Sequence, residues 1–230
     1  MRPLYIAPCL LILSAPTLSN AESPWPTESW RFDVGLTLSR FEQQVKSEIG
    51  GARGERLVEE SRLGAVTYAT WHAWGPLSVG GFLQYDAGTR RAGRFEGLDE
   101  NNMTVVEGEV GGGFSELWLG PVVRGQWKQL YLELGYGLLG RRTDDARGDL
   151  PNTAGNVDDA LETSPTVAWM FGLGAHVPIT ETLDVALRVN YRIRYYDQRG
   201  GKPLVDELVH GTQDITPFIG LSWRVDDDVN

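Results

Sequence analysis

Apolar and polar residues alternate with a period of two along most of the chain. The clearest stretch runs from Leu183 to Tyr195, where every odd position is apolar or aromatic. The even positions of the same stretch include Arg188, Arg192 and Arg194. Successive side chains of a β-strand point to opposite faces. The pattern therefore predicts a strand with one apolar face and one charged face.

The same alternation recurs along the chain and predicts a series of strands. It is regular in segments 32–39, 130–139, 167–177 and 215–225, less regular in 77–85 and 114–123, and ambiguous in 62–74. In segment 130–139 the even residues are expected to face outward and the odd residues, ending with Leu139, inward. Strands that cross an outer membrane need about 9–11 residues, a length that these segments can supply.

The connections between the segments alternate strictly between long and short. Long loops are expected at about 42–61, 87–113, 143–164 and 197–213, and short turns at 75–76, 125–128 and 178–182. Outer-membrane barrels have long external loops and short periplasmic turns. With both chain ends on the periplasmic side, this order predicts an even number of strands, about eight.

The polarity of the two faces separates a membrane barrel from a soluble one. The seven apolar residues on one face of 183–195 would promote aggregation in water, and no soluble core needs three inward arginines. A soluble lipocalin-like barrel would place its apolar residues inside. We therefore expect an all-β fold, an antiparallel up-and-down transmembrane β-barrel with lipid outside and a polar lumen.

The first residues have the features of a secretory signal peptide. Arg2 is followed by an apolar stretch, and small residues precede a cleavage site after Ala21. We expect residues 1–21 to be removed and residues 22–230 to form the barrel in the outer membrane of a Gram-negative bacterium. The single cysteine, Cys9, lies in this segment, so the mature barrel should contain no disulfide. The net charge of −10 does not favour nucleic acid as a partner.

The inward face of the expected barrel carries charges of both signs. A barrel of eight strands is only just wide enough for side chains to fill it, and buried charges must be paired. We therefore expect a network of ion pairs that plugs the lumen, in which the arginines pair with acids such as Glu133 and Asp33. A narrow channel or porin for small solutes is the alternative. The network is expected to contain Asp33, Asp86, Glu116, Glu133, Arg188, Arg192, Arg194 and Arg224.

Aromatic residues fall at the ends of the predicted strands, where a membrane barrel carries its interfacial girdles. Four tryptophans are expected on the periplasmic side: Trp30, Trp74, Trp127 and Trp223. Trp169 and Tyr195 are expected near the external rim.

The sequence offers little for catalysis or metal binding. Small barrels that modify lipid A use a histidine on the external side with a serine partner. Here His72 and His176 fall near periplasmic strand ends, and no serine is identified as a partner of His210 in the last external loop. The acidic pairs lack the spacing of a calcium loop. We expect no catalytic residue, no metal and no cofactor, and keep a lipid A-modifying enzyme as a second alternative.

The signal peptide, the eight alternating segments, the loop order and the aromatic-rich run 218–223 together resemble the small OmpA-type outer-membrane β-barrel family. The resemblance implies a small, non-catalytic single barrel whose surface loops have structural or binding roles. It also implies contacts with outer-membrane lipids and lipopolysaccharide, and a monomer. Trp223 is similar to the final-strand aromatic residue that the barrel-assembly machinery reads, although this chain continues beyond it to Asn230.

Overall fold

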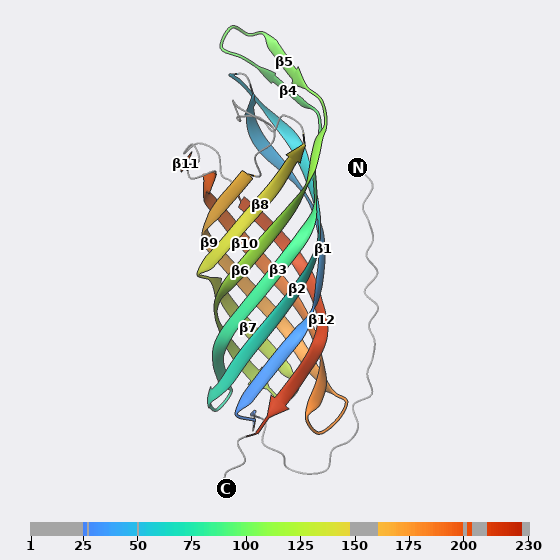
Figure 1. The fold of residues 1–230 in the computed structure, drawn as a ribbon, viewed down its shortest axis with the longest axis vertical. Helices are drawn as coiled ribbons and strands as arrows, with labels where there is room; N and C mark the ends of the chain where they lie inside the picture. The colour runs from blue at the N-terminus through green and yellow to red at the C-terminus, as the bar shows by residue number, and fades with distance from the viewer. Residues whose placement is uncertain are drawn as a thin grey trace.

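The alternating segments form long antiparallel strands that close on themselves into a barrel (Figure 1). The computed structural model describes residues 25–26, 28–49, 51–147, 161–199, 202–203 and 211–226. The expected signal peptide, residues 1–21, lies outside the described residues. Among the residues that are described, no helix is long and apolar enough to cross a membrane.

Eight strands form the wall of the barrel, with β7 and β8 acting as one interrupted strand. Their order around the ring is β1, β12, β10, β9, β7–β8, β6, β3 and β2, and β2 pairs again with β1. This confirms the predicted all-β antiparallel barrel. The wall strands are β1 (Trp30–Ile49), β2 (Ala52–Trp74), β3 (Leu77–Ala92), β6 (Val110–Trp127), β7 (Leu130–Gly137), β8 (Leu139–Arg147), β9 (Leu161–Pro178), β10 (Leu183–Arg199) and β12 (Gly211–Val225). Three short strands complete the sheet: β4 (Phe95–Leu98), β5 (Thr104–Glu107) and β11 (Lys202–Pro203).

The two ends of the barrel differ in their connections. At one end, called here the lower end, short turns join β2 to β3, β6 to β7 and β9 to β10. The start of β1 and the end of β12 also lie there (Figure 1). In the first of these turns Gly75 has a φ of +53°, a left-handed conformation that glycine adopts without a steric penalty.

At the opposite, upper end the strands continue well beyond the segments that were predicted from the alternation of apolar and polar residues. β1 and β2 stay paired from Trp30 opposite Trp71 to Ile49 opposite Ala52. Segment 42–61, expected as a loop, is therefore mostly strand, because backbone pairing continues where apolar alternation stops. β4 pairs with β2 and with β5. The upper parts of β1 and β2 together with β4 and β5 form a projecting sheet, seen at the top of Figure 1.

The wall is apolar outside and polar inside. On β10, Leu187 is 39% exposed on the outer face, whereas its neighbour Arg188 is only 3% exposed in the lumen. In the ambiguous segment of β2, Leu63 and Trp71 face outward and Arg62 faces inward. Every wall strand contributes an exposed large apolar residue, for example Leu36, Leu63, Leu83, Leu119, Leu132, Leu173, Leu187 and Ile219. An apolar surface that encircles the molecule in this way requires a non-aqueous surrounding.

A β-bulge between β7 and β8 changes which residues face outward. Val122 lies opposite Gly135, but Leu119 lies opposite Leu139, so one extra residue is inserted on the β7–β8 side. Leu138 and Leu139 are consequently both exposed on the outside. The expectation that Leu139 faces inward is wrong, because a bulge reverses the alternation of the residues that follow it.

The aromatic residues expected at the interfaces lie on the outer face. Trp30 is the first residue of β1, and Trp74 and Trp127 are the last residues of β2 and β6. These three and Trp223 are exposed at the lower end. Trp169 is exposed farther up, with its ring 4.9 Å from that of Tyr136. The side chain of Tyr195 lies outside the described residues.

The polarity of the wall predicts a large cost for a charge on its outer face. Replacing Leu187 with arginine should lower the free energy of unfolding in lipid by about 2–4 kcal/mol, the usual cost of arginine near the bilayer midplane. Val225→Arg, at the lower end of β12, is the matched control and should cost about 0–1 kcal/mol. Urea titrations of both variants in lipid vesicles measure the difference. Equal costs at the two positions would contradict the assigned polarity.

Candidate functional site: the charged lumen

The middle of the lumen is filled by an apolar layer. Tyr68 is enclosed in it, with its hydroxyl 3.3 Å from the sulfur of Met170 and its ring beside those of Phe82 and Phe218. The layer contains Val66, Tyr68, Phe82, Trp118, Val122, Ala168, Met170, Ala186 and Phe218. Buried ion pairs lie on both sides of it and form the groups described next.

The lowest ion pairs lie at the rim of the barrel. Arg31 binds Glu28 and Asp184, with 2.8 Å between its Nη1 and the Asp184 Oδ2. Arg224 binds the other oxygen of Asp184 at 3.1 Å and also donates to the backbone carbonyl of Thr180. Arg224, which the sequence placed in the lumen network, therefore lies at the lower rim and is partly exposed.

Above the rim, the lower ion-pair group is built around Glu133. Arg124 donates to Glu133 at 2.7 Å and to Asp33 at 2.6 Å, and Arg188 donates to Glu133 at 2.9 Å. The guanidinium of Arg124 lies over the ring of Tyr131, 4.5 Å from its centroid. This group contains two carboxylates and two guanidinium groups, which come from four different wall strands.

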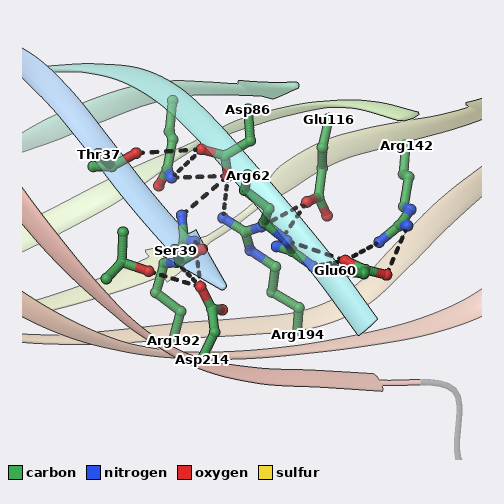
Figure 2. Close-up of polar contacts among 12 residues, drawn as sticks. Thr37, Ser39, Glu60, Arg62, Asp86, Glu116, Arg142, Arg192, Arg194 and Asp214 are labelled. Carbon is green, nitrogen blue, oxygen red and sulfur yellow. Dashed lines mark hydrogen bonds and ion pairs between the residues drawn. The ribbon is translucent and has the colours of Figure 1, made fainter. Parts of the chain in front are cut away.

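The upper ion-pair group forms a continuous chain across the lumen (Figure 2). Arg192 binds Asp214 and, at 3.0 Å, Asp86. Arg194 binds Asp86 at 3.1 Å and Glu116 at 2.6 Å. The contacts therefore join β10 to β12 beside it, and to β3 and β6, with which it does not pair in the sheet.

The same chain of contacts continues toward the upper mouth of the barrel. Arg62 binds Glu116 at 3.3 Å and Glu60 at 2.6 Å, and Arg142 binds Glu60 at 2.9 Å (Figure 2). With these residues the upper group has four buried carboxylates and four buried guanidinium groups. A buried charge without a partner costs several kcal/mol. Matching charge within each group offsets that cost.

Little space remains between the apolar layer and the upper group. A recess there, lined by Phe82, Trp118, Met170, Arg192 and Arg194 among others, has a volume of about 10 Å³. A volume of this size holds about one water molecule. It does not admit a larger solute.

The structure places the predicted lumen residues in different groups. Asp33, Glu133 and Arg188 belong to the lower group, and Asp86, Glu116, Arg192 and Arg194 to the upper group. Within these contacts Asp33 pairs with Arg124, whereas it was expected to pair with one of the three β10 arginines.

Five residues of the two groups were not identified from the sequence. Alternation could have found Arg124, which shares its parity with Glu116, and Asp214, which shares its parity with Thr216. The other three gave no usable signal, because Arg142 follows the bulge, and Glu60 and Arg62 lie where the pattern of β2 was ambiguous or was read as a loop.

Both histidines in the described part of the chain lie near the lower end of the barrel. His72 has its Nε2 2.9 Å from the carbonyl oxygen of Gly75 in a lower turn. His176 is buried against Tyr131, with its Nε2 3.7 Å from Asp33. His210 lies outside the described residues. Within the described ranges, no three histidine, cysteine or acidic side chains are grouped so that they could hold a metal ion.

Comparisons with known proteins find similar solved structures but no match by sequence. No protein-family model matches the chain, and no curated protein matches its sequence. The outer membrane protease OmpT from Escherichia coli is similar to 87% of this chain over 98% of its own length, with 8% identity and a TM-score of 0.40. The translocator domain of autotransporter NalP from Neisseria meningitidis is similar to 85% of this chain over 88% of its own, with 12% identity and a TM-score of 0.30. The strand pairing of the chain itself establishes the barrel fold.

The closed network predicts that removing one buried cation is costly. Arg192→Met keeps much of the side-chain volume but leaves the buried carboxylate of Asp214 without its cation, which should cost about 3–5 kcal/mol of unfolding free energy. Arg40→Met is the matched control, since Arg40 is 67% exposed and 3.7 Å from Glu59, and should cost about 0–1 kcal/mol. Urea titration in lipid vesicles measures both. A loss at position 192 no larger than that of the control would show that the lumen is hydrated enough to tolerate unpaired charge.

Proposed function

We propose that the chain is an integral protein of the bacterial outer membrane, that its lumen is closed by its own side chains, and that it supports a projecting sheet for contacts outside the bilayer. One observation carries the proposal: a closed ring of strands has large apolar residues around its outside, and inside it paired charges lie on both sides of an apolar layer.

The dimensions of the outer apolar face suit a bilayer. On β1 the outward residues from Trp30 to Leu38 are all apolar or aromatic, and the next outward residue is the exposed Arg40. A run of this length matches the roughly 9–11 residues that a tilted strand needs to cross. Because the ring closes, no strand edge in the wall is left to face hydrocarbon with unpaired backbone groups.

The proposed lipid contacts follow from this placement. The outward leucines and valines would contact acyl chains, and the tryptophans of the lower end would lie at the headgroup level. Arg40, at the upper border of the apolar surface, would face the phosphate groups of lipopolysaccharide. The aromatic run that ends at Trp223 would be recognised by the barrel-assembly machinery, and the wall is complete in a single chain, which supports a monomer.

The proposed closure of the lumen rests on two features. The apolar layer opposes the passage of hydrated ions, since an apolar constriction excludes water. In the ion pairs on either side of this layer, guanidinium nitrogens and carboxylate oxygens lie 2.6–3.3 Å apart. Charged side chains engaged in this way fill the space that a porin leaves for solute. This favours a closed barrel over a narrow channel.

A non-catalytic role belongs to the same proposal. The upper carboxylates are enclosed by guanidinium groups and lie inside the barrel, away from the outer leaflet where a lipid substrate would be. The described histidines lie at a lower turn and beneath the apolar layer. The projecting sheet is then the part of the described structure that is placed to meet other molecules.

A conductance measurement tests whether the lumen is closed. Purified protein inserted into a planar bilayer in 1 M KCl, a concentration chosen to maximise the signal, should give no stable current steps, because no continuous aqueous path crosses the apolar layer. Insertion is verified separately by protease protection of the strands after reconstitution of the same purified protein into lipid vesicles. A steady ohmic conductance of the unmodified protein would contradict the proposal and favour the channel.

A further inference from the structure

We propose that the free edge of β5 in the projecting sheet binds an extended, cationic peptide segment, which adds to the sheet as one more strand. The inference rests on the proposed function, in which the projecting sheet lies outside the bilayer, and it names the class of partner.

The edge is open because β5 is the last strand in the order β2, β4, β5. Among the described strands β5 pairs only with β4. Figure 1 shows the β4–β5 hairpin at the top of the molecule, beyond the wall strands. A strand edge presents backbone N–H and C=O groups that a further strand can pair with.

The hydrogen-bond pattern of the hairpin shows which groups point to the open edge. The N–H of Asp99 donates to the carbonyl of Met103 at 3.0 Å. Pairs alternate along an antiparallel ladder, so the next pair, Leu98 and Thr104, is not hydrogen-bonded, and neither is Glu96 with Val106. The backbone groups of Thr104 and Val106 therefore point away from β4, toward the open edge.

The side chains around this edge are apolar and acidic. Val106 is 50% exposed, and Leu98 and Met103 are exposed beside it. Segment 94–109 contains one cation, Arg94, and five acids: Glu96, Asp99, Glu100, Glu107 and Glu109. A partner strand that alternates apolar and basic residues would complement both features.

The acidic charge of segment 94–109 argues against a second copy of this chain as the partner that binds the β5 edge. Two β5 edges brought together would place two acidic hairpins side by side, and like charges on neighbouring strands are destabilising. A basic strand meets the opposite charge. The observations therefore favour a cationic peptide over self-association.

Binding is tested with the full chain in nanodiscs of zwitterionic phosphatidylcholine, which attracts cationic peptides weakly. The probe is a fluorescent ten-residue peptide of alternating lysine and valine, and its anisotropy is measured at low salt and at 0.5 M salt. We expect saturable binding that weakens with salt. A peptide of alternating glutamate and valine should bind at least tenfold more weakly.

Two changes test pairing through the backbone. Val106→Pro removes an N–H from the open edge without removing a bond to β4, and should weaken binding at least tenfold, whereas Val106→Thr, which keeps the N–H, should not. A lysine–valine peptide with N-methyl groups at alternate residues should also fail to bind the unmodified protein. This second measurement does not depend on how well the proline variant folds.

Several outcomes would overturn the inference. They are equal binding of the acidic and basic peptides, full binding of the N-methylated peptide, or dimerisation in sedimentation that Val106→Pro abolishes without any peptide binding. Conductance of the unmodified barrel would contradict the proposed closure of the lumen, but it says nothing about β5. The two proposals can therefore fail separately. A closed, membrane-inserted barrel that binds no peptide would overturn this inference alone.

Discussion

Pairing of guanidinium and carboxylate groups across the lumen is the interaction on which the rest of the structure depends. Arg192 and Arg194 extend from β10 to Asp86 on β3 and Glu116 on β6. These strands are not neighbours in the ring, so the contacts hold opposite sides of the wall at a fixed separation. Each arginine needs an acid at a matching height, and that requirement restricts the register of the strands.

The charged interior and the apolar exterior belong to one arrangement. Because side chains alternate along each strand, a polar residue inside places its neighbour outside. A strand with Arg188 in the lumen therefore presents Leu187 to the surroundings, and a complete ring of such strands presents an apolar surface on every side. That surface is stable only in a lipid phase, and only a closed ring satisfies its backbone there. Above the bilayer the strands need not alternate in this way. There β4 and β5 extend the sheet from β2, outside the ring, and end in an open edge.

The sequence predicted the fold well because the outward and inward faces of most strands differ strongly. It predicted fewer of the lumen contacts, and the reasons are local. The bulge at Leu138 reverses the alternation, which concealed Arg142. Strand pairing of β1 with β2 continues through polar sequence that resembles a loop, which concealed Glu60. Parity also gives the face of a residue but not its partner, so that Asp33 could not be matched to Arg124 without the register of the strands between them.

The placement of the barrel in the membrane determines which exposed leucines face lipid. Leu187 lies on the wall of the barrel, and Leu57 lies on the projecting sheet, and both are exposed. The only natural cysteine, Cys9, falls in the expected signal peptide, so a cysteine introduced at either position can be labelled alone with a fluorophore. In vesicles whose acyl chains carry bromine, the label at position 187 should be quenched and the label at position 57 should not. Equal quenching at the two positions, or none at position 187, would contradict the placement of the barrel in the membrane.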